Sequence, residues 1–510
     1  MEAKMEDKFM VEVDEMGGAT PLEVGGDYTL PDYMPEVRRL LRVDTRATIS
    51  GTYPNGDKTE VGGDCHYDML YTDEEGHIVS APLDGTFECV VPTKDVEDGQ
   101  ILLRVENVLC RPAGPRRVSM KANLAVKPKV VRREEVADAA SKTEGEEVEL
   151  MRKSLTSADT VLFSKREVPL GDKIKVEPRS TMLSTDGKVL VREVKCKENE
   201  VEVRGEVWVS CLLANGEHTP YTITVKIPFT ELIDKEGITP NGKGMAWGKV
   251  RNIATALSQE DSTDTLGLDI LMDLRGMAYE NKVLAPAVDL YALQCPEKVT
   301  TAPLTCRWYP GMAMGNFTVD GAISCDTMGI TPGEHPIDVR GEVMSAQGTV
   351  NGKEVIVEGE MKLYPIFTCE NSYVASTGTI PYKVRLQMPE MVPDGSSLSV
   401  FAECVGCHAR MDGSRMVADM ELYVTALATK NETCQVVTEV SFDSDCPYMD
   451  EMGEIIAVYL EGGDHLWKVG KKYHTSLRDL QCGNGLPEEI LTQPDDPQLL
   501  DGLARLLIER

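Results

Sequence analysis

The chain has 510 residues, too many for a single hydrophobic core, so its length predicts about three or four domains. Apolar residues make up 42% and charged residues 27% of the sequence, as in ordinary folded proteins. The formal net charge of -31 disfavours binding to nucleic acid and to anionic membrane surfaces, because their phosphates would repel the chain.

The first residues, MEAKMEDKFMVEVDEMGG, mix acidic and basic charges and contain no apolar run of signal-peptide length. A membrane-spanning helix needs roughly 18 consecutive apolar residues, and the sequence contains no such stretch. The 14 cysteines are spread from Cys65 to Cys482 without a tight framework. We therefore expect a cytoplasmic chain without a transmembrane segment, with reduced thiols, many of them buried, and no structural disulfides.

Three stretches of the chain resemble one another, beginning at Lys58, Asn199 and Lys353. Each runs from an alternating apolar segment through a glycine to a second apolar segment, a turn and a third segment. Period-two alternation and β-branched residues indicate half-buried strands. The shared glycines, Gly63, Gly205 and Gly359, indicate a bulge or a sharp bend within these strands.

Each copy closes with a further hairpin-like pair of strands. The sequence therefore predicts a mainly β protein with three tandem antiparallel β-sandwich-like domains, at residues 1–131, 160–298 and 299–450. Between the first two, residues 132–159 are charged, rich in Glu and Ala, and lack strand alternation. This composition predicts a helical or mobile linker.

The string CVGCH, residues 404–408, has the spacing on which c-type haem is attached. It lies in the closing hairpin of the third copy, where superposition sets Cys407 against Cys110 of the first copy and Thr255 of the second. We therefore interpret it as a variant of an ordinary strand. Haem attachment normally belongs to exported proteins, and a four-cysteine zinc site would need a second cysteine pair, so we expect neither haem nor metal here.

The common catalytic and nucleotide-binding motifs are missing from the sequence. The seven histidines form no HExxH pair, and there is no GxSxG elbow, GxxxxGK[ST] loop or helix-opening GxGxxG. Carboxylates are abundant, but no motif selects a pair for glycosidase-like chemistry. We predict a binding or structural protein, with no catalytic residue, no cofactor and no metal. An enzyme hidden in the β domains is a third alternative that no motif supports.

Residues 451–510 have a different pattern. A strand from Glu454 to about Glu461 precedes a glycine pair and Asp464, which we expect to cap a helix that ends at Tyr473. Ser476 has capping-box-like spacing for a second short helix, and the residues GNG at 483–485 would end it. The residues ARLLIER supply a closing strand. The pattern predicts a small βααβ domain.

This domain is similar to a LysM domain. The opening motif of that family is matched by Gly463, Asp464, His465, Leu466 and Trp467, and its later motifs by Lys472-Tyr473, Asn484 to Leu486 and Leu506 to Ile508. His465 replaces the usual threonine or serine, and the segment from Pro487 to Asp501 is long and acidic for the family. Both departures lie near the loops that bind N-acetylglucosamine polymers in typical members. For Trp467 and Tyr473 we favour simple packing in the domain core over a binding role.

Residues 25–51, followed by VGGDCHYDMLYTDEEG, are similar to the SPOCS domains of spore-coat assembly proteins. Three such units and a terminal LysM domain resemble the SipL-type morphogenetic family of endospore formers. The resemblance implies a non-enzymatic adaptor in the mother-cell cytoplasm, at the outer surface of the forespore. Its LysM-like domain would bind a coat-morphogenetic ATPase, and its β units would act as spacers or as docking surfaces for other coat proteins.

We expect the ATPase to bind the exposed faces around Asp464, His465, Lys468, Asn484 and Leu486. The alternative function is that of a lectin-like LysM protein that binds peptidoglycan or chitooligosaccharides. That alternative requires access to the cell wall, and hence an export route that the sequence does not show.

Overall fold

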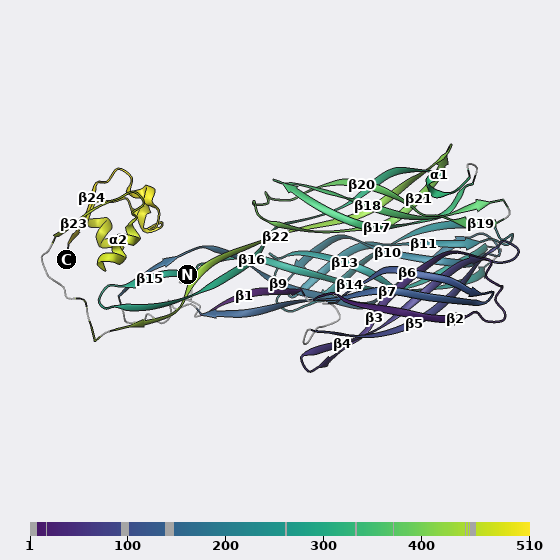
Figure 1. Ribbon diagram of the computed structural model, residues 1–510, viewed down its shortest axis with the longest axis horizontal. Coiled ribbons are helices and arrows are strands. Elements are labelled where there is room, and N and C mark those ends of the chain that lie inside the picture. Colours follow the sequence, from purple (N-terminus) through teal and green to yellow (C-terminus); the bar gives the residue numbers. More distant parts are fainter. Residues whose placement is uncertain are drawn as a thin grey trace.

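The computed structural model describes residues 8–16, 18–92, 101–137, 147–260, 263–331, 334–370, 372–443, 445–446, 448 and 455–509. Most of these residues form long antiparallel strands, and most of the helical residues belong to the C-terminal domain. Figure 1 shows an elongated molecule, with β sandwiches side by side at one end and the helical domain (yellow) at the other. The expected fold class is confirmed. Within the described ranges, no helix is both long and apolar enough to cross a membrane.

The first sandwich consists of two sheets. One sheet contains β3 (Arg39–Asn55), β4 (Lys58–Thr72) and β5 (Ile78–Val91), with β4 in the centre. The other contains β2 (Thr20–Thr29), β7 (Arg117–Ala137) and β6 (Ile101–Gly114), with β7 in the centre. β1 (Lys8–Met16) pairs with β7 beyond the start of β2, so β1 and β2 lie one after the other along the same edge of β7 and together take the place of the first strand.

The second and third sandwiches repeat this topology. The second contains β9 (Leu155–Val176), β10 (Thr181–Lys197), β11 (Glu200–Ala214), β12 (Pro220–Asp234), β13 (Lys243–Glu260) and β14 (Thr263–Leu284). The third contains β16 (Glu297–Ser324), β17 (Pro336–Asn351), β18 (Glu354–Cys369), β19 (Ser372–Ala375), β20 (Gly378–Gln387), β21 (Ser397–Asp412) and β22 (Arg415–Phe442), with the short helix α1 (Cys325–Met328). In each copy the second, third and fourth strands form one sheet, and the sixth strand lies between the first and the fifth in the other.

The glycines shared by the three copies lie next to bulges, as expected from the sequence. Gly205 pairs with the residue that precedes a break in register on β10. A Cβ at Gly205 would lie 2.2 Å from the carbonyl oxygen of Leu190, so the strands approach too closely there for any side chain. The ring of Phe229, directly opposite on β12, covers the glycine. Gly63 is close to the carbonyl oxygen of Thr48 and the ring of Phe87 in the same way, and Gly359 is close to the carbonyl oxygen of Ser345 and the hydroxyl of Tyr382.

Each sandwich closes around its own apolar core, because alternate residues of each strand point inward. In the third sandwich the two central strands provide much of this core. Residues contributed by β18 and β22 include Val355, Val357, Met361, Leu363, Met416, Ala418, Met420 and Leu422.

Where the structure describes residues 132–159, most of them lie in strands and not in the helical or mobile linker that their composition predicts. Residues 132–137 continue β7, β8 occupies Val148–Arg152, and β9 begins at Leu155; residues 138–146 lie outside the described residues. The physical reason is tertiary pairing. β1, more than a hundred residues earlier in the chain, forms a ladder with the end of β7, and this pairing overrides the helix propensity of Glu and Ala, which is only a weak bias beside tertiary contacts.

A narrow stalk leads from the sandwiches toward the C-terminal domain. It consists of the extended ends of the first and last strands of each copy, which form three ribbons, β1–β7, β9–β14 and β16–β22, that contact one another. Their shared core contains Leu155, Leu304, Cys306, Cys434 and Val436. A two-stranded ribbon of β8 and β15 (Ala287–Ala292) lies at the end of the stalk, and Figure 1 shows β15 close to the C-terminal domain.

The C-terminal domain has the predicted βααβ order. β23 (Ile455–Tyr459) pairs with β24 (Arg505–Glu509), and between them lie α2 (Leu466–Tyr473), α3 (Leu477–Gly483) and the 3-10 helices η3 (Glu488–Leu491) and η4 (Pro497–Leu500). Ser476 caps α3, as expected. The cap of α2 is His465, however, and not Asp464. Asp464 instead accepts a hydrogen bond from the Glu461 backbone N (2.9 Å) and closes the preceding turn.

Candidate functional site

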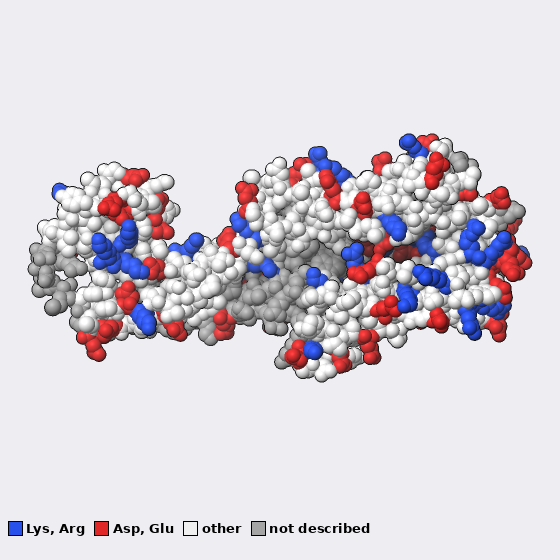
Figure 2. Space-filling view, in the orientation of Figure 1, with Lys and Arg blue, Asp and Glu red and all other residues white. Residues whose placement is uncertain are grey.

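The three sandwiches contact one another in a closed ring. The fourth strand of each sandwich lies against the second strand of the next: β5 against β10, β12 against β17, and β19 against β3. Equivalent elements therefore make the three contacts in cyclic order, as in a trimer of identical subunits, but within one chain. Figure 2 shows acidic and basic side chains gathered along the seam between the third sandwich and those below it.

One end of this junction is apolar. Near the start of the second strand of each sandwich, a residue is bulged out of register with the third strand; these residues are Leu41, Leu183 and Ile337. They pack together with residues of the neighbouring third strands, Leu70, Leu212 and Ile366, which also occupy equivalent positions. A bulge redirects a side chain and bends its strand, and here it directs one apolar residue from each copy toward the other two.

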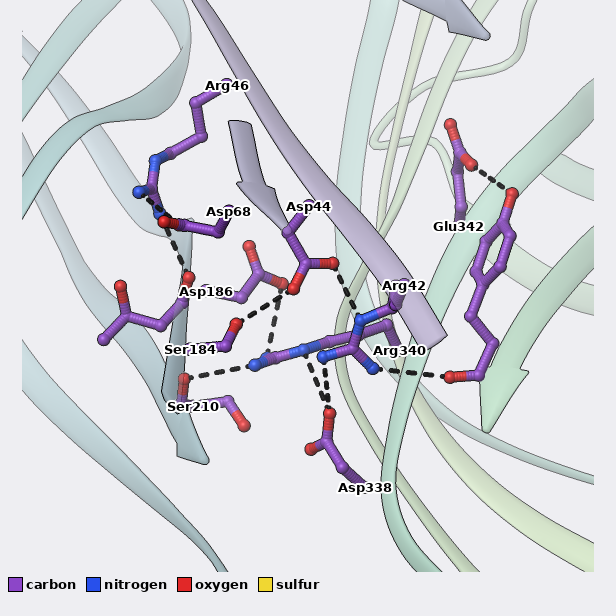
Figure 3. A network of polar contacts seen from close by, with 12 residues as sticks. Arg42, Asp44, Arg46, Asp68, Ser184, Asp186, Ser210, Asp338, Arg340 and Glu342 are labelled. Atoms are coloured by element: carbon purple, nitrogen blue, oxygen red, sulfur yellow. Dashed lines mark hydrogen bonds and ion pairs between the residues drawn. The ribbon is translucent and has the colours of Figure 1, made fainter. Parts of the chain in front are cut away.

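A buried polar network follows directly after the bulges (Figure 3). The Nη2 atom of Arg42 lies 2.7 Å from Oδ2 of Asp338, and its Nε lies 2.9 Å from Oδ1 of Asp44. The Nε of Arg340 lies 3.5 Å from the same Asp338 oxygen. Ser184 donates a hydrogen bond to Asp44 (2.9 Å). The side chains of Arg42 and Asp338 are only 6% and 1% exposed, so this ion pair has lost most of its contact with water.

The network also binds backbone groups across the sandwich boundaries. Arg340 donates to the carbonyl oxygen of Ser210 (3.4 Å), and Arg46 donates to that of Thr185 (3.0 Å). Arg340 lies 3.6 Å from the carboxylate of Asp186. Figure 3 shows that residues of all three sandwiches converge on this one place.

The three repeats have diverged at the positions that meet. The first residue after the bulge is Arg42, Ser184 or Asp338, and the charges of Arg42 and Asp338 are complementary. Identical charged residues from all three copies would repel one another at this distance. Although burial opposes ionisation of Asp338, the nearby charges of Arg340 and Arg42 lower its pKa to about 2. The network therefore favours one cyclic order of the copies.

The string CVGCH lies beside this network, on β21. A bulge at Val405 interrupts the pairing of β21 with β22 and places Val405 in the core of the second sandwich. Gly406 then lies against Trp208, where a Cβ would come within 3.0 Å of the indole ring. The interpretation of the string as a variant strand agrees with this position, and the segment joins two sandwiches.

The register expected for this segment from the sequence is wrong by two residues. The fifth strands β6, β13 and β21 each carry a bulge, and these bulges align Cys404 with Val105 and Val250. In that alignment Cys407 does not match Cys110 or Thr255. The bulge fixes the geometry of the strand, whereas a cysteine shared by chance between two copies does not.

The thiols of this string are poorly suited to ligand chemistry. Burial raises the pKa of Cys404 to about 12 and also raises the pKa of Cys407. Metal binding and nucleophilic attack require the thiolate, which is scarce at such pKa values. In the part of the chain that the structure describes, no group of three or more His, Cys, Asp and Glu side chains is arranged to hold a metal ion. All 14 cysteines lie in that part, and none of them is in a disulfide there.

We expect Cys404 and Cys407 to react with iodoacetamide at least about 100-fold more slowly than the exposed Cys446 and Cys482, because Cys404 is buried, Cys407 is partly buried, and the thiolate forms of both are disfavoured. Peptide mass spectrometry after brief labelling of the folded protein would measure this ratio. Labelling in urea is the control and should make the four rates similar. Equal rates in the folded protein would contradict the conclusion that Cys404 and Cys407 are protected and poorly reactive.

Three of the residues expected to bind a partner gather at the start of α2. Lys468 forms an ion pair with Asp464 (2.7 Å), and the backbone N of Lys468 donates to Nδ1 of His465 (3.3 Å). Hydrogen bonds from the Glu461 backbone and from Lys468 lower the pKa of Asp464. Figure 2 shows basic side chains over α2, which carries Lys468, Lys471 and Lys472.

The other two residues expected at this site hold the domain together. Asn484 donates to the carbonyl oxygens of Leu480 (2.9 Å) and Leu507 (2.7 Å) and accepts from the Leu507 backbone N (2.6 Å), which ties the end of α3 to β24. Leu486 is buried in the domain core, so its side chain is not available to a partner. The structure therefore brings Asp464, His465 and Lys468 together. Asn484 and Leu486 instead stabilise the domain.

An exposed apolar stripe on the C-terminal domain was not predicted. Ile455 (68% exposed), Ala457 and Tyr459 (71% exposed) project from one face of β23, and Leu507 (38% exposed) lies opposite Ala457 on β24. The sequence IIAVY is apolar throughout, so its periodicity does not distinguish the inner from the outer face. By contrast Trp467 is buried, and the core packing expected for this residue is confirmed.

The fold and the junction define a repeat protein in which three β sandwiches join through buried interfaces and carry a small αβ domain. A family model described as "SipL, SPOCS domain" matches residues 180–257. The match spans β10 to most of β13 and includes Ser184 and Asp186 of the junction. It supports a SipL-type protein and suggests a role related to the sporulation coat. Comparisons with curated proteins and with solved structures gave no match.

Proposed function

We propose that this protein is a non-enzymatic adaptor in endospore coat assembly, whose LysM-like domain binds a coat-morphogenetic ATPase at the forespore surface. The SPOCS match in the second sandwich supports the coat role and the absence of catalysis. The shared topology of the sandwiches supports extending the SPOCS assignment to the first and third. The protein then acts in the mother-cell cytoplasm, at the outer surface of the forespore, and its ring of sandwiches serves as a docking platform for other coat proteins.

The observation that carries the ATPase interaction is the exposed apolar stripe of Ile455, Ala457, Tyr459 and Leu507. Exposed apolar side chains that share one face of a sheet indicate an interaction surface, and tyrosine is a frequent source of binding energy at interfaces. The cross-strand partners of Tyr459 and Ile455 are Arg505 and Glu509. The stripe therefore has a polar rim around an apolar centre, as protein interfaces do.

The polar residues at the start of α2 would contribute less to affinity. Lys468 is well exposed, and its ion pair with Asp464 is open to solvent on one side. Exposed pairs contribute at most about 1 kcal/mol. We assign Asp464, His465 and Lys468 to the periphery of the interface and the apolar stripe to its centre.

The test is a capture experiment with the full-length protein. We expect Tyr459→Asp to weaken retention of the coat ATPase from a sporulating lysate at least about 30-fold, because it places a charge at the centre of the interface. Tyr33→Asp is the matched control, because Tyr33 is also a strongly exposed tyrosine (86%) and belongs to the first sandwich. Quantitative immunoblotting of the ATPase would measure the difference.

The same samples distinguish the lectin alternative. The adaptor should not bind insoluble peptidoglycan, with or without the Tyr459 substitution. Sedimentation with peptidoglycan together with undiminished ATPase capture by Tyr459→Asp would exclude the proposed interface. If the wild-type chain sediments with peptidoglycan and the Tyr459→Asp variant does not, the result would favour glycan binding.

A further inference from the structure

The β8–β15 ribbon has two faces that contact different parts of the molecule. Leu150 and Leu290 pack with Val437 of β22 at the end of the stalk. The residues adjacent to them in sequence, Met151 and Tyr291, belong to the core of the C-terminal domain. Because successive side chains of a strand point to opposite faces, one short ribbon joins the stalk to the terminal domain.

Tyr291 is a core residue of the C-terminal domain although it lies far from that domain in the sequence. Its side chain is fully buried, and its ring meets that of Trp467 edge to face, with 4.9 Å between centroids. Its hydroxyl donates a hydrogen bond to the carbonyl oxygen of Thr475 (2.8 Å), between α2 and α3. Burial accounts for the raised pKa of this tyrosine. An aromatic pair of this kind adds to the stabilisation that burial alone gives.

Two carboxylates of the ribbon complete the contact. Asp289 accepts hydrogen bonds from Nε1 of Trp467 (2.8 Å) and from Nζ of Lys471 (2.6 Å). Glu149 accepts one from the backbone N of Leu477 (3.0 Å), in the first turn of α3. Donors that would otherwise need water are therefore satisfied by the ribbon.

Gly470 shows how closely the ribbon and α2 approach each other. It is buried inside α2, where alanine would be the better helix former. A Cβ at this position would lie 2.3 Å from the hydroxyl oxygen of Tyr291, and its next neighbours would be 3.1 Å away. The presence of glycine at position 470 is therefore explained by a contact outside its own helix, because it leaves space for Tyr291.

We propose that the β8–β15 ribbon is an integral part of the C-terminal domain and fixes its orientation on the stalk, with Asp289 and Tyr291 as positioning residues. The ribbon covers the side of α2 that carries Trp467 and Gly470, and it contacts the first turn of α3 at Leu477. Among the described residues, the outer face of β23 and β24 makes none of these contacts, and Ile455, Tyr459 and Leu507 are exposed there. The consequence for the partner, which rests on the proposed function, is that the ATPase is held in a fixed direction relative to the ring.

The decisive measurement is hydrogen exchange of the full-length protein carrying Gly470→Ala. If the ribbon is docked, the added methyl group meets Tyr291, and amides of residues 148–152 and 287–292 should exchange at least about 10-fold faster. If the ribbon is not docked, the substitution only improves the helix, and exchange should slow or stay the same. That second result would overturn the proposal.

Two further variants make the result specific. Tyr291→Phe removes the oxygen that the new methyl group would meet, so Tyr291→Phe with Gly470→Ala should recover much of the protection lost in Gly470→Ala. Gly483→Ala is the matched control, because Gly483 ends the other helix and a Cβ there would meet no atom within 4 Å. It should leave ribbon exchange unchanged. Failure of the double variant to recover protection would argue against a contact at Tyr291.

The positioning role is measured separately from ATPase binding. Tyr459→Asp should lose ATPase capture while ribbon exchange stays as in the wild type. Gly470→Ala should speed ribbon exchange, and it should weaken assembly of the ATPase with ring-bound coat proteins more than capture of the ATPase alone. If the wild-type chain captures no ATPase at all, the proposed function fails, whereas the exchange results still decide whether the ribbon is docked. Equal losses in capture and assembly would remove the positioning role.

Discussion

Replacing Asp338 with alanine is expected to lower the free energy of unfolding by about 3–5 kcal/mol, because it leaves the buried guanidinium of Arg42 without its carboxylate. Arg340 loses the same partner. Chemical denaturation of the full-length protein would measure the loss. The control is Asp419→Ala, which removes the exposed ion pair with Arg410 in the third sandwich. This control should change the free energy of unfolding by less than about 1 kcal/mol.

A double variant tests whether the loss arises from the ion pair. Arg42→Met with Asp338→Leu removes both charges and keeps apolar volume in the junction, and it should be more stable than Asp338→Ala alone. Replacements of this type in other buried ion pairs are often neutral or stabilising. If the two substitutions destabilise additively, the residues are not coupled in the way that the structure indicates.

The same pair gives the junction a pH dependence. The folded-state pKa of Asp338 is about 2, below its ordinary value of 3.8. A carboxyl group with a lowered folded pKa contributes stability above its unfolded pKa, and this contribution disappears as the pH falls through the folded pKa. The advantage of the wild type over Asp338→Asn should therefore be constant above about pH 5 and should shrink by about 2 kcal/mol between pH 4 and pH 2. If the difference in stability between the wild type and Asp338→Asn stayed constant down to pH 2, the lowered pKa of Asp338 would be contradicted.

Replacing Gly359 with alanine is expected to cost about 3 kcal/mol or more, although glycine is usually the less stable choice in a strand. A Cβ there would lie 1.9 Å from the carbonyl oxygen of Ser345 and 2.8 Å from the hydroxyl of Tyr382. The first neighbour is backbone, so it cannot move away without disturbing the bulge. The thermal midpoint and the urea midpoint of the variant should both fall.

Gly26→Ala is the matched control for this substitution. Gly26 also lies in a strand, β2, and a Cβ at that position would meet nothing within 4 Å. Its replacement should be neutral or slightly stabilising, because it reduces the freedom of the unfolded chain. Similar effects of the two substitutions would show that close packing at the bulge is not the reason for Gly359.

The local sequence pattern was sufficient to predict the strands and the repeats. Alternating apolar residues indicate one buried face whatever covers it, and the shared glycines mark a bulge that each copy forms within its own sheets. The same holds for the terminal domain, where the spacing of Leu466, Trp467 and Gly470 and the cap at Ser476 depend on neighbours a few residues away. The interpretation of CVGCH as a variant of an ordinary strand also followed from its position in a repeated hairpin.

Other features depended on partners distant in the sequence. Residues 132–137 become a strand because β1 pairs with them, and composition cannot reveal that partner. Asn484 and Leu486 resemble ligand-binding positions in a motif, but their role is decided by β24 and by the domain core. The exposed stripe could not be separated from the buried residues of β23, because both faces of that strand are apolar.

The sequence by itself determined the strands, the three copies and the small terminal domain, because these depend on periodicity and turns within each segment. Only the tertiary structure decided how the copies meet. Arg42, Asp338 and Arg340 look like ordinary surface charges in alternating strands, and they become a buried network only because three equivalent strands converge. In the same way Tyr291 becomes part of a domain that begins more than 150 residues later. Burial of charge and close approach of backbones are properties of assembled elements, and no single segment contains them.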